Sequence, residues 1–315
     1  MYQPQYIATT LFEGNYDYGV GALLNSLVSS GFKGLYCVGY KGKLPFWTNQ
    51  LKLIDDKEII FQVTDDVFIR FDLLDNVCMH FGYYKPYYLK SMFDIYPHAK
   101  GYYYFDPDIV VLAKWSFFDN WLNSGINLCQ DSNYTLVHFN HPWRTKWKED
   151  FYEFICSERN DNLNIYINSG FIGVNLDNFE IIDNWIKINN KYINYGYPKD
   201  YFDQSNSLSA YKGDQDVLNA TMTIYSHLNF SILGKEGMAF DFPHSVMAHA
   251  VDANGIKPWK RRYIKHAIEG KPASAADQFY LNYCSQPIEI YGKNNLMIRF
   301  FQLKISKIIS RLLKK

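Results

Sequence analysis

Strand-like and helix-like segments alternate along the first half of the chain. Short apolar or aromatic stretches predict strands at residues 6–11, 34–40, 58–63 and 101–105. The longer segments at residues 19–30 and 87–96 suit helices, and the first of these carries its apolar side chains at helical spacing. This alternation predicts an α/β fold in which helices cover a mostly parallel sheet. Ligands of such sheets bind at the carboxyl ends of the strands, so we expect the chemistry there.

The second half of the chain is less regular. Strands are predicted at residues 126–129 and 165–174, and helices at residues 141–157 and 214–224. Residues 189–209 are rich in Asn, Tyr, Gly and Ser, a composition that predicts a long loop. Because we find no internal repeat and no low-complexity linker, we expect one compact domain over residues 1–290 and an appendage over residues 291–315.

The appendage has the pattern of a basic amphipathic helix. Its apolar side chains follow one helical stripe, at Met297, Phe300, Phe301, Ile305, Ile308, Ile309, Leu312 and Leu313. Basic side chains occupy the other faces, at Arg299, Lys304, Lys307, Arg311, Lys314 and Lys315. Such a helix binds in a membrane interface and is attracted to anionic lipids. The alternative is a terminal helix that docks on its own domain or on a partner.

Composition narrows the class of protein. With 315 residues, 48% hydrophobic and 20% charged, the chain is neither disordered nor collagen-like. Five scattered cysteines without a CxxC pair fit neither a disulfide framework nor a zinc knuckle. The net charge of +0 combines an acidic body with a basic tail, and nothing in the body indicates a nucleic-acid face. We find no signal peptide and no membrane-spanning run, and therefore predict a cytoplasmic protein.

Two acidic residues, Asp106 and Asp108, follow the aromatic strand predicted at residues 101–105 and flank Pro107. Residues i and i+2 of an extended segment point to the same side, so both carboxylates can face one spot. Pro107 keeps Asp106 out of the helical region and stiffens the turn. Two oxygen ligands on a rigid strand end suit Mg²⁺ or Mn²⁺ shared with substrate phosphates. The alternative is a simple turn, since Asp and Pro are common turn residues.

Further landmarks share one order along the chain. They are Thr9-Thr10 after the first strand, Tyr18-Gly19-Val20-Gly21, Asn168-Ser169-Gly170, Gly213-Asp214-Gln215-Asp216, and His249 followed by Lys257-Pro258-Trp259. In these segments and their order the sequence resembles glycosyltransferase family 8, the group that contains glycogenin and bacterial lipooligosaccharide galactosyltransferases. The resemblance extends from Thr9 to Trp259, which is most of the chain.

The resemblance implies a GT-A fold, the Rossmann-like fold of nucleotide-diphospho-sugar transferases, in a single domain. It also implies a retaining hexosyltransferase that uses UDP-galactose or UDP-glucose. The acceptor would be a saccharide of a glycolipid or surface polysaccharide, as in lipopolysaccharide biosynthesis. Together with the basic tail, this predicts a peripheral protein on the inner face of the cytoplasmic membrane.

The resemblance also implies the donor-binding and metal-binding residues. Thr9, Thr10 and Tyr18 would line the nucleoside pocket, with Tyr18 stacked on the base, and Lys90 would reach the donor. The metal ligands for Mn²⁺ or Mg²⁺ would be Asp106, Asp108 and His249, and Lys257 would contact the phosphates. Two of these residues have a structural alternative: Tyr18 can pack at a helix start, and Lys90 can be a solvated helix lysine.

Three residues would surround the transferred sugar by the same resemblance: Asn168, Asp214 and Gln215. Asp214 would hold sugar hydroxyls, and the Gln215 carbonyl would lie opposite the leaving group, where cleavage develops oxocarbenium character. Gln is a poor covalent nucleophile, which favours a front-face route, and Asp216 is the alternative nucleophile. Acids at positions 214 and 216 also suit a helix N-terminus.

The chain departs from the family pattern after His249. The usual spacing is H-x-x-G-x-x-K-P-W, whereas here Gly255 lies six positions beyond His249 and Lys257 two beyond Gly255. An insertion with Asn254 at the usual glycine place explains the difference, and His244 is the second choice as ligand. An inverting transferase on this fold, or a non-catalytic sugar-nucleotide or membrane-binding protein, remains an alternative. The cluster Asn140–Arg144 could line an acceptor site, with Trp143 stacked on a sugar.

Overall fold

The computed structural model describes residues 3–134, 136–155, 163–203, 205, 208–240, 245–251 and 255–313. The chain divides into two compact units, which are described separately. The first unit comprises Met1–Leu11, Leu74–Phe105 and Phe117–Lys235. The second comprises Phe12–Leu73, Asp106–Ser116 and Glu236–Lys315. Each unit therefore combines segments that are distant in sequence.

Strands of the first unit form a sheet in the order β10-β8-β9-β6-β1. Their bounds are β1 (Tyr6–Phe12), β6 (Gly101–Phe105), β8 (Ile126–Gln130), β9 (Ile167–Val174) and β10 (Phe230–Leu233). β1 pairs with β6 in parallel, as β8 does with β10, whereas β9 is antiparallel to both β6 and β8. All positions of β1, β6 and β9 are buried, as expected for strands covered on both faces.

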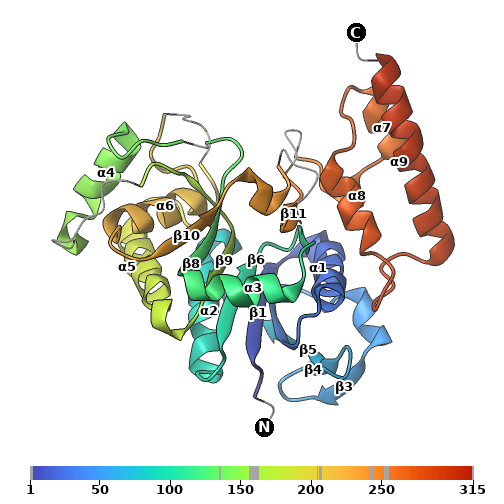
Figure 1. The fold of residues 1–315 in the computed structure, drawn as a ribbon, viewed down its shortest axis with the longest axis horizontal. Helices are drawn as coiled ribbons and strands as arrows, with labels where there is room; N and C mark the ends of the chain where they lie inside the picture. Colours follow the sequence, from blue (N-terminus) through green and yellow to red (C-terminus); the bar gives the residue numbers. More distant parts are fainter. Residues whose placement is uncertain are drawn as a thin grey trace. The chain divides into compact units, whose positions relative to one another are not determined.

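Helices of the first unit are α2 (Phe81–Ile95), α3 (Trp115–Trp121), α4 (Pro142–Asp150), α5 (Glu180–Asn194) and α6 (Asp214–Ile224). α5 packs against both α2 and α6 (Figure 1). It does so through a buried stripe at Ile181, Trp185, Ile188 and Tyr192, which repeats at helical spacing. This packing holds the N-terminus of α6 beside α2, and that junction positions one of the two polar clusters described below.

The second unit contains α1 (Asp17–Ser30) and two sets of strands. In one set, β2 (Gly34–Tyr40) and β5 (Val67–Leu73) are parallel, and β4 (Ile60–Gln62) and β3 (Lys52–Asp55) extend it antiparallel. The other set pairs β7 (Ile109–Val111) with β11 (Met247–His249) in antiparallel orientation. α1 packs against β7. Short 3-10 helices of the chain lie at Gly14–Tyr16, Phe46–Gln50, Leu122–Ser124, Tyr152–Phe154, Leu176–Asn178, Lys235–Met238 and Pro258–Lys260.

Three C-terminal helices complete the second unit: α7 (Tyr263–Ile268), α8 (Ala275–Asn282) and α9 (Lys293–Leu313). α9 packs against α7 and α8 (Figure 1), and Leu303 and Ser306 on its inner face are fully buried. A buried ion pair of 3.2 Å between Arg261 and Asp277 joins the start of this region to α8. Within the part of the chain that the structure describes, no helix is long and apolar enough to cross a bilayer.

The predicted α/β class is confirmed, and several elements match closely. The strands predicted at residues 34–40 and 101–105 and the helix at residues 214–224 coincide with β2, β6 and α6. The loop predicted at residues 189–209 is wrong at its start, because α5 continues to Asn194. The helix predicted from residue 87 begins six residues earlier, at Phe81. The predicted domain boundary at residue 290 stays a prediction.

Candidate functional site

The segment Asp106-Pro107-Asp108 connects β6 to β7 as a tight turn. The backbone amide of Ile109 donates to the carbonyl of Asp106 over 3.0 Å and closes the turn. Pro107 has no amide hydrogen and fixes its own φ, so the two acidic side chains are held in one arrangement. The Asp108 side chain is only 4% exposed and that of Asp106 is 21% exposed. The Asp108 carboxylate is therefore buried, and that of Asp106 is partly exposed.

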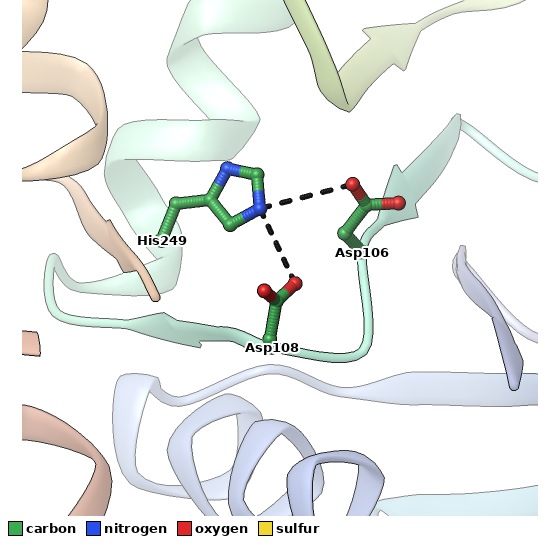
Figure 2. Close-up of side chains that lie close together, drawn as sticks. All are labelled: Asp106, Asp108 and His249. Atoms are coloured by element: carbon green, nitrogen blue, oxygen red, sulfur yellow. Dashed lines mark ion pairs between the residues drawn. The ribbon is translucent and has the colours of Figure 1, made fainter. Parts of the chain in front are cut away.

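The pairing of β11 with β7 brings His249 to the turn. His249 is the register partner of Ile109, and the amide of Ala250 donates to the carbonyl of Asp108 over 3.0 Å. Figure 2 shows the imidazole between the two acids, with Nε2 at 3.2 Å from an Asp108 oxygen and 3.8 Å from an Asp106 oxygen. The structure thus joins the three predicted metal ligands, although more than 140 residues of sequence separate Asp108 from His249.

Gly19 in α1 allows the helix to approach this turn. A Cβ atom at position 19 would lie 2.1 Å from the carbonyl oxygen of Pro107 and 2.8 Å from the Trp259 ring. Real Cβ atoms essentially never come that close to backbone, so any side chain here would displace the turn. Gly19 is therefore a packing requirement of the Asp-Pro-Asp turn, a role that the sequence alone does not reveal.

Lys257 also reaches the group formed by Asp106, Asp108 and His249, which we call the metal-ligand cluster. Its ammonium forms an ion pair with Asp108 and donates to the carbonyl of Ala250 over 3.2 Å. Burial alone would lower the pKa of Lys257, but the carboxylate of Asp108 raises it overall. Burial alone would raise the pKa of Asp108, but His249 and Lys257 outweigh it and hold that pKa well below its usual range. Asp108 is therefore ionised at neutral pH, as a metal ligand must be.

The residues of this cluster fit a hard divalent cation. The side chains of Asp106, Asp108 and His249 each offer one ligand atom, and these atoms lie within 4.8 Å of one another. Two carboxylate oxygens and an imidazole nitrogen, with the positively charged Lys257 beside them, suit Mg²⁺ or Mn²⁺ that keeps open positions for a ligand. The second choice of ligand, His244, lies outside the described residues, as does Asn254.

A second polar cluster lies in the first unit, where β9 meets the N-terminus of α6. Asp214 is 7% exposed, and its Oδ2 atom lies 2.9 Å from Lys85 Nζ and accepts a hydrogen bond of 2.8 Å from Ser169 Oγ. Lys85 Nζ also donates to the carbonyl of Ser169 over 3.0 Å. Burial alone would raise the pKa of Asp214, but the charge of Lys85 lowers it overall. Asp214 is thus a buried, ionised carboxylate.

The neighbours of Asp214 are also fixed by β9. Gln215 Oε1 accepts a hydrogen bond of 3.2 Å from the Ser169 amide. The side chain of Asn168 is directed elsewhere, because its Nδ2 atom donates to Asp131 over 2.9 Å. Asp216 is 2% exposed and caps the helix: its oxygens accept hydrogen bonds from the Tyr166 hydroxyl at 2.6 Å and from the amides at the helix start. Burial raises the pKa of Asp216 more than these bonds lower it.

Other predicted binding residues lie in varied surroundings. Thr9 donates to the Tyr103 carbonyl over 2.9 Å, whereas the buried Thr10 hydroxyl has no partner among the described residues. Tyr18 lies against Phe46 and Tyr291, with ring centroids 5.1 and 5.8 Å away. Lys90 forms ion pairs with two acids of α2 and α5, Asp94 at 3.3 Å and Asp183 at 3.6 Å, so it is held on the helix surface.

Three residues of these clusters were missed by the sequence analysis. Tyr16 contacts Trp259, and its ring centroid lies 6.0 Å from Lys257 Nζ, so it borders the metal-ligand cluster, whereas the predicted Tyr18 lies against Phe46 and Tyr291. Lys85, and not Lys90, reaches Asp214. Asp131 is buried beside Asn168. A correct start for α2 would have placed Lys85 in its second turn, on the side that faces the sheet.

The fold of the chain is shared with solved structures. The chain has the mixed α/β fold of GT-A glycosyltransferases, with a helix at its C-terminus. Among solved structures, LgtC in complex with donor and acceptor sugar analogues is 14% identical, covers 93% of this chain and 99% of its own, and gives a TM-score of 0.53.

Two larger glycosyltransferases are similar over part of their length. The bifunctional glycosyltransferase WbbM is 15% identical over 95% of this chain with a TM-score of 0.50, and the chain spans about half, 52%, of WbbM. GlyE of Streptococcus pneumoniae TIGR4 is 12% identical over 95% of this chain and 65% of its own, with a TM-score of 0.52. No family model and no curated protein matches the sequence. The likeness shows the fold, and membership of glycosyltransferase family 8 stays a prediction.

Proposed function

We propose that the protein is a metal-dependent, retaining glycosyltransferase. It transfers a hexose from a nucleotide sugar, UDP-galactose or UDP-glucose, to a saccharide acceptor of a glycolipid or surface polysaccharide, as in lipopolysaccharide biosynthesis. The observation that carries the proposal is the cluster of Asp106, Asp108 and His249 beside Lys257, in a GT-A fold. The LgtC structure that holds donor and acceptor sugar analogues supports the assignment of substrates.

In this proposal the metal-ligand cluster holds the diphosphate of the donor. Asp106, Asp108 and His249 would hold a divalent cation, which would supply positive charge to the departing diphosphate. Lys257 adds a second positive charge next to Asp108, and its burial strengthens that contact. Tyr16 and Trp259 border the cluster and reduce its access to water. Tyr16 replaces Tyr18 as the aromatic residue that we expect to contact the nucleotide.

The Asp214 cluster is assigned to the transferred hexose. Among the described residues, Lys85 and Ser169 both contact Oδ2 of Asp214, so Oδ1 is left to accept hydrogen bonds from sugar hydroxyls. In a front-face transfer the bond from the anomeric carbon to the phosphate oxygen breaks, and the acceptor oxygen bonds to the same face. The acceptor proton passes to the leaving phosphate. Gln215 would stabilise the positively charged sugar from the opposite face, and NMR of the product's anomeric configuration tests retention.

Thermal unfolding with nucleotides tests the donor site. We expect UDP with Mn²⁺ to stabilise the protein by about 2.7 kcal/mol at a hundredfold excess over Kd, because the ligand binds only the folded state. UDP without Mn²⁺, and GDP or CMP with Mn²⁺, should give much smaller shifts.

Two controls accompany this measurement. The variant Asp106→Asn should lose the manganese-dependent part of the shift, whereas Asp56→Asn, an exposed acid of the same unit, should keep it. If none of the nucleotides stabilises the protein, with or without Mn²⁺, the proposed function is contradicted.

We further propose that α9 attaches the enzyme to an anionic membrane, at the inner face of the cytoplasmic membrane. Met297, Phe301, Ile308 and Leu312 are 58–78% exposed and share one helix face, since their spacing is four, seven and four residues. This stripe differs from the inner face that packs on α7. Exposed basic residues flank it, at Lys293, Lys304, Lys307 and Arg311, whereas Arg299 stacks 4.2 Å from the Tyr291 ring. Lys314 and Lys315 lie outside the described residues.

Substitution of the exposed stripe tests the membrane proposal. Replacing Met297, Phe301, Ile308 and Leu312 by Ser should abolish co-sedimentation with vesicles that contain anionic lipid, while transfer to a soluble acceptor is kept. Deleting α9 is a weaker test, because Leu303 is fully buried and its loss would expose α7. A matched control replaces Leu53 and Ile54, each 48% exposed on β3, by Ser. Equal sedimentation of the stripe variant and the wild type would contradict the proposal.

A further inference from the structure

Phe202 lies against two glycines of the first unit. A Cβ atom at Gly82 would lie 2.8 Å from Cζ of the Phe202 ring, and one at Gly213 would lie 3.2 Å from Cδ1. The His80 ring meets Phe202 edge-on, with the centroids 4.3 Å apart. Two positions without side chains therefore let an aromatic ring rest directly on the backbone at the starts of α2 and α6.

The carboxylate of Asp214 lies at the same place, next to Gly82. The Cβ position of Gly82 that touches Phe202 also lies 3.1 Å from Asp214 Oδ1, the oxygen that the contacts of Lys85 and Ser169 leave open. The ring of Phe202 and this carboxylate oxygen are therefore neighbours across Gly82. Asp214 is 7% exposed and Phe202 is 37% exposed, so of these two neighbours the ring is the more accessible to solvent.

The ring of Trp143, another aromatic side chain of the first unit, is already covered. Trp143, the residue predicted to stack on an acceptor sugar, is 9% exposed, and the Lys212 ammonium lies 3.5 Å from its ring centroid. Its indole NH donates to the Leu208 carbonyl over 3.0 Å. Because the ring of Trp143 is occupied in this way, it does not offer a free face to a ligand, whereas Phe202 retains an exposed surface beside a carboxylate.

We propose that Phe202 is a specificity-determining residue that holds the acceptor saccharide. This rests on the proposed function, in which Asp214 binds the transferred hexose. The acceptor hydroxyl must reach the anomeric carbon of that hexose, so the acceptor has to bind beside Asp214, and Phe202 is an accessible neighbour of that carboxylate. A pyranose has a face of C–H bonds that packs on an aromatic ring without hydrogen bonds. The site therefore favours acceptors whose terminal sugar presents such a face.

Steady-state kinetics of Phe202 variants test this assignment. The acceptors are methyl β-glycosides of galactose, glucose and N-acetylglucosamine, with UDP-galactose or UDP-glucose as donor. Phe202→Ala should raise the KM for the acceptor about tenfold, by the loss of one ring contact. The Kd for the UDP-hexose and the rate of donor hydrolysis without acceptor should be unchanged. Phe202→Tyr should retain the wild-type acceptor KM. Tyr201→Ala, the neighbouring residue at 60% exposure, is the matched control.

The outcomes separate the two proposals. An unchanged acceptor KM in Phe202→Ala overturns the assignment of Phe202, as does a weaker UDP-hexose Kd with the UDP Kd unaffected, since the ring would then contact the donor sugar. If the wild type neither binds UDP with Mn²⁺ nor hydrolyses a donor, the proposed function fails. In that case the assignment of Phe202 can still be tested by saturation-transfer NMR, which measures binding of the methyl glycosides to the wild type and to Phe202→Ala. Equal saturation transfer in the two proteins overturns the assignment of Phe202.

Discussion

The variant Asp106→Asn is expected to lose transfer activity and to bind Mn²⁺ more than about 100-fold more weakly, because even residues that only orient a ligand affect metal affinity 10- to 100-fold. Asp106 is the best position for this test. Its side chain is 21% exposed, so the substitution disturbs the fold less than one at the buried Asp108. Calorimetric titration with Mn²⁺ and measurement of donor hydrolysis report the two effects independently.

Asp56→Asn is the matched control, since Asp56 is an exposed acid in the same unit. It should bind Mn²⁺ like the wild type. Asp106→Asn is expected to keep the wild-type circular-dichroism spectrum and Tm, which would show that any loss is local. Wild-type Mn²⁺ affinity in Asp106→Asn would remove Asp106 from the set of ligands.

The variant Lys85→Met is expected to lose both stability and turnover. Lys85 and Asp214 form a buried ion pair at 2.9 Å, and removing one partner of such a pair typically costs about 3–5 kcal/mol. Without Lys85, burial dominates and raises the pKa of Asp214, whereas in the wild type the charge of Lys85 lowers it. The wild-type pair therefore stabilises the fold above the pKa of unfolded Asp and loses this effect in acid. The stability gap between wild type and Lys85→Met should be largest at neutral pH and shrink as pH falls.

A double-mutant cycle separates stability from catalysis in this pair. Lys85→Met with Asp214→Asn should recover part of the lost stability, because no unpaired charge remains buried. Its turnover should stay low, since the carboxylate that we propose to bind the sugar is gone. Lys90→Met is the matched control on the same helix, where the lysine pairs with partly exposed acids at the surface. Equal Tm values for Lys85→Met and Lys90→Met would contradict the buried pair.

Elements that are continuous in sequence and buried on both faces could be predicted well. β2 and β6 are fully buried stretches of apolar and aromatic residues, and their predicted bounds coincide with the observed ones. β5 was missed because only every second position is buried, and Arg70 and Asp72 interrupt its apolar pattern. α5 was missed because Asn-rich segments reduced its helical signal, although its buried side chains repeat at helical spacing.

The candidate sites show which contacts a sequence pattern can predict and which it cannot. Asp106 and Asp108 could be predicted as a pair, because their relation is local. The contact of His249 with Asp108 depends on the pairing of β7 with β11, which is set by tertiary packing. Whether Lys85 or Lys90 reaches Asp214 depends on which side of α2 faces the sheet. The helix predicted from residue 87 does not include Lys85, so the sequence pattern does not reveal this contact.

The amphipathic pattern of α9 was also incomplete as a guide. The predicted stripe treats the apolar residues as one face, yet the structure divides them. Phe300, Ile305 and Ile309 are half-buried, whereas Phe301 and Ile308 are exposed. Leu303, which lies outside the predicted stripe, packs inward on the unit. A helix with two apolar sides can dock on its own protein and still present a second side, so the two alternatives stated for the tail are compatible. Sequence spacing alone could not separate them.

The anchoring of the metal-ligand cluster bears on how such sites tolerate insertions. His249 is positioned by its register with Ile109, and Lys257 by its contacts with Asp108 and the Ala250 carbonyl. Neither anchor depends on how many residues separate the histidine from the lysine. The longer spacing in this chain is therefore an allowed variation in length, and a fixed-spacing motif search would overlook it. Searches for comparable enzymes should match the two anchors separately and leave the distance between them free.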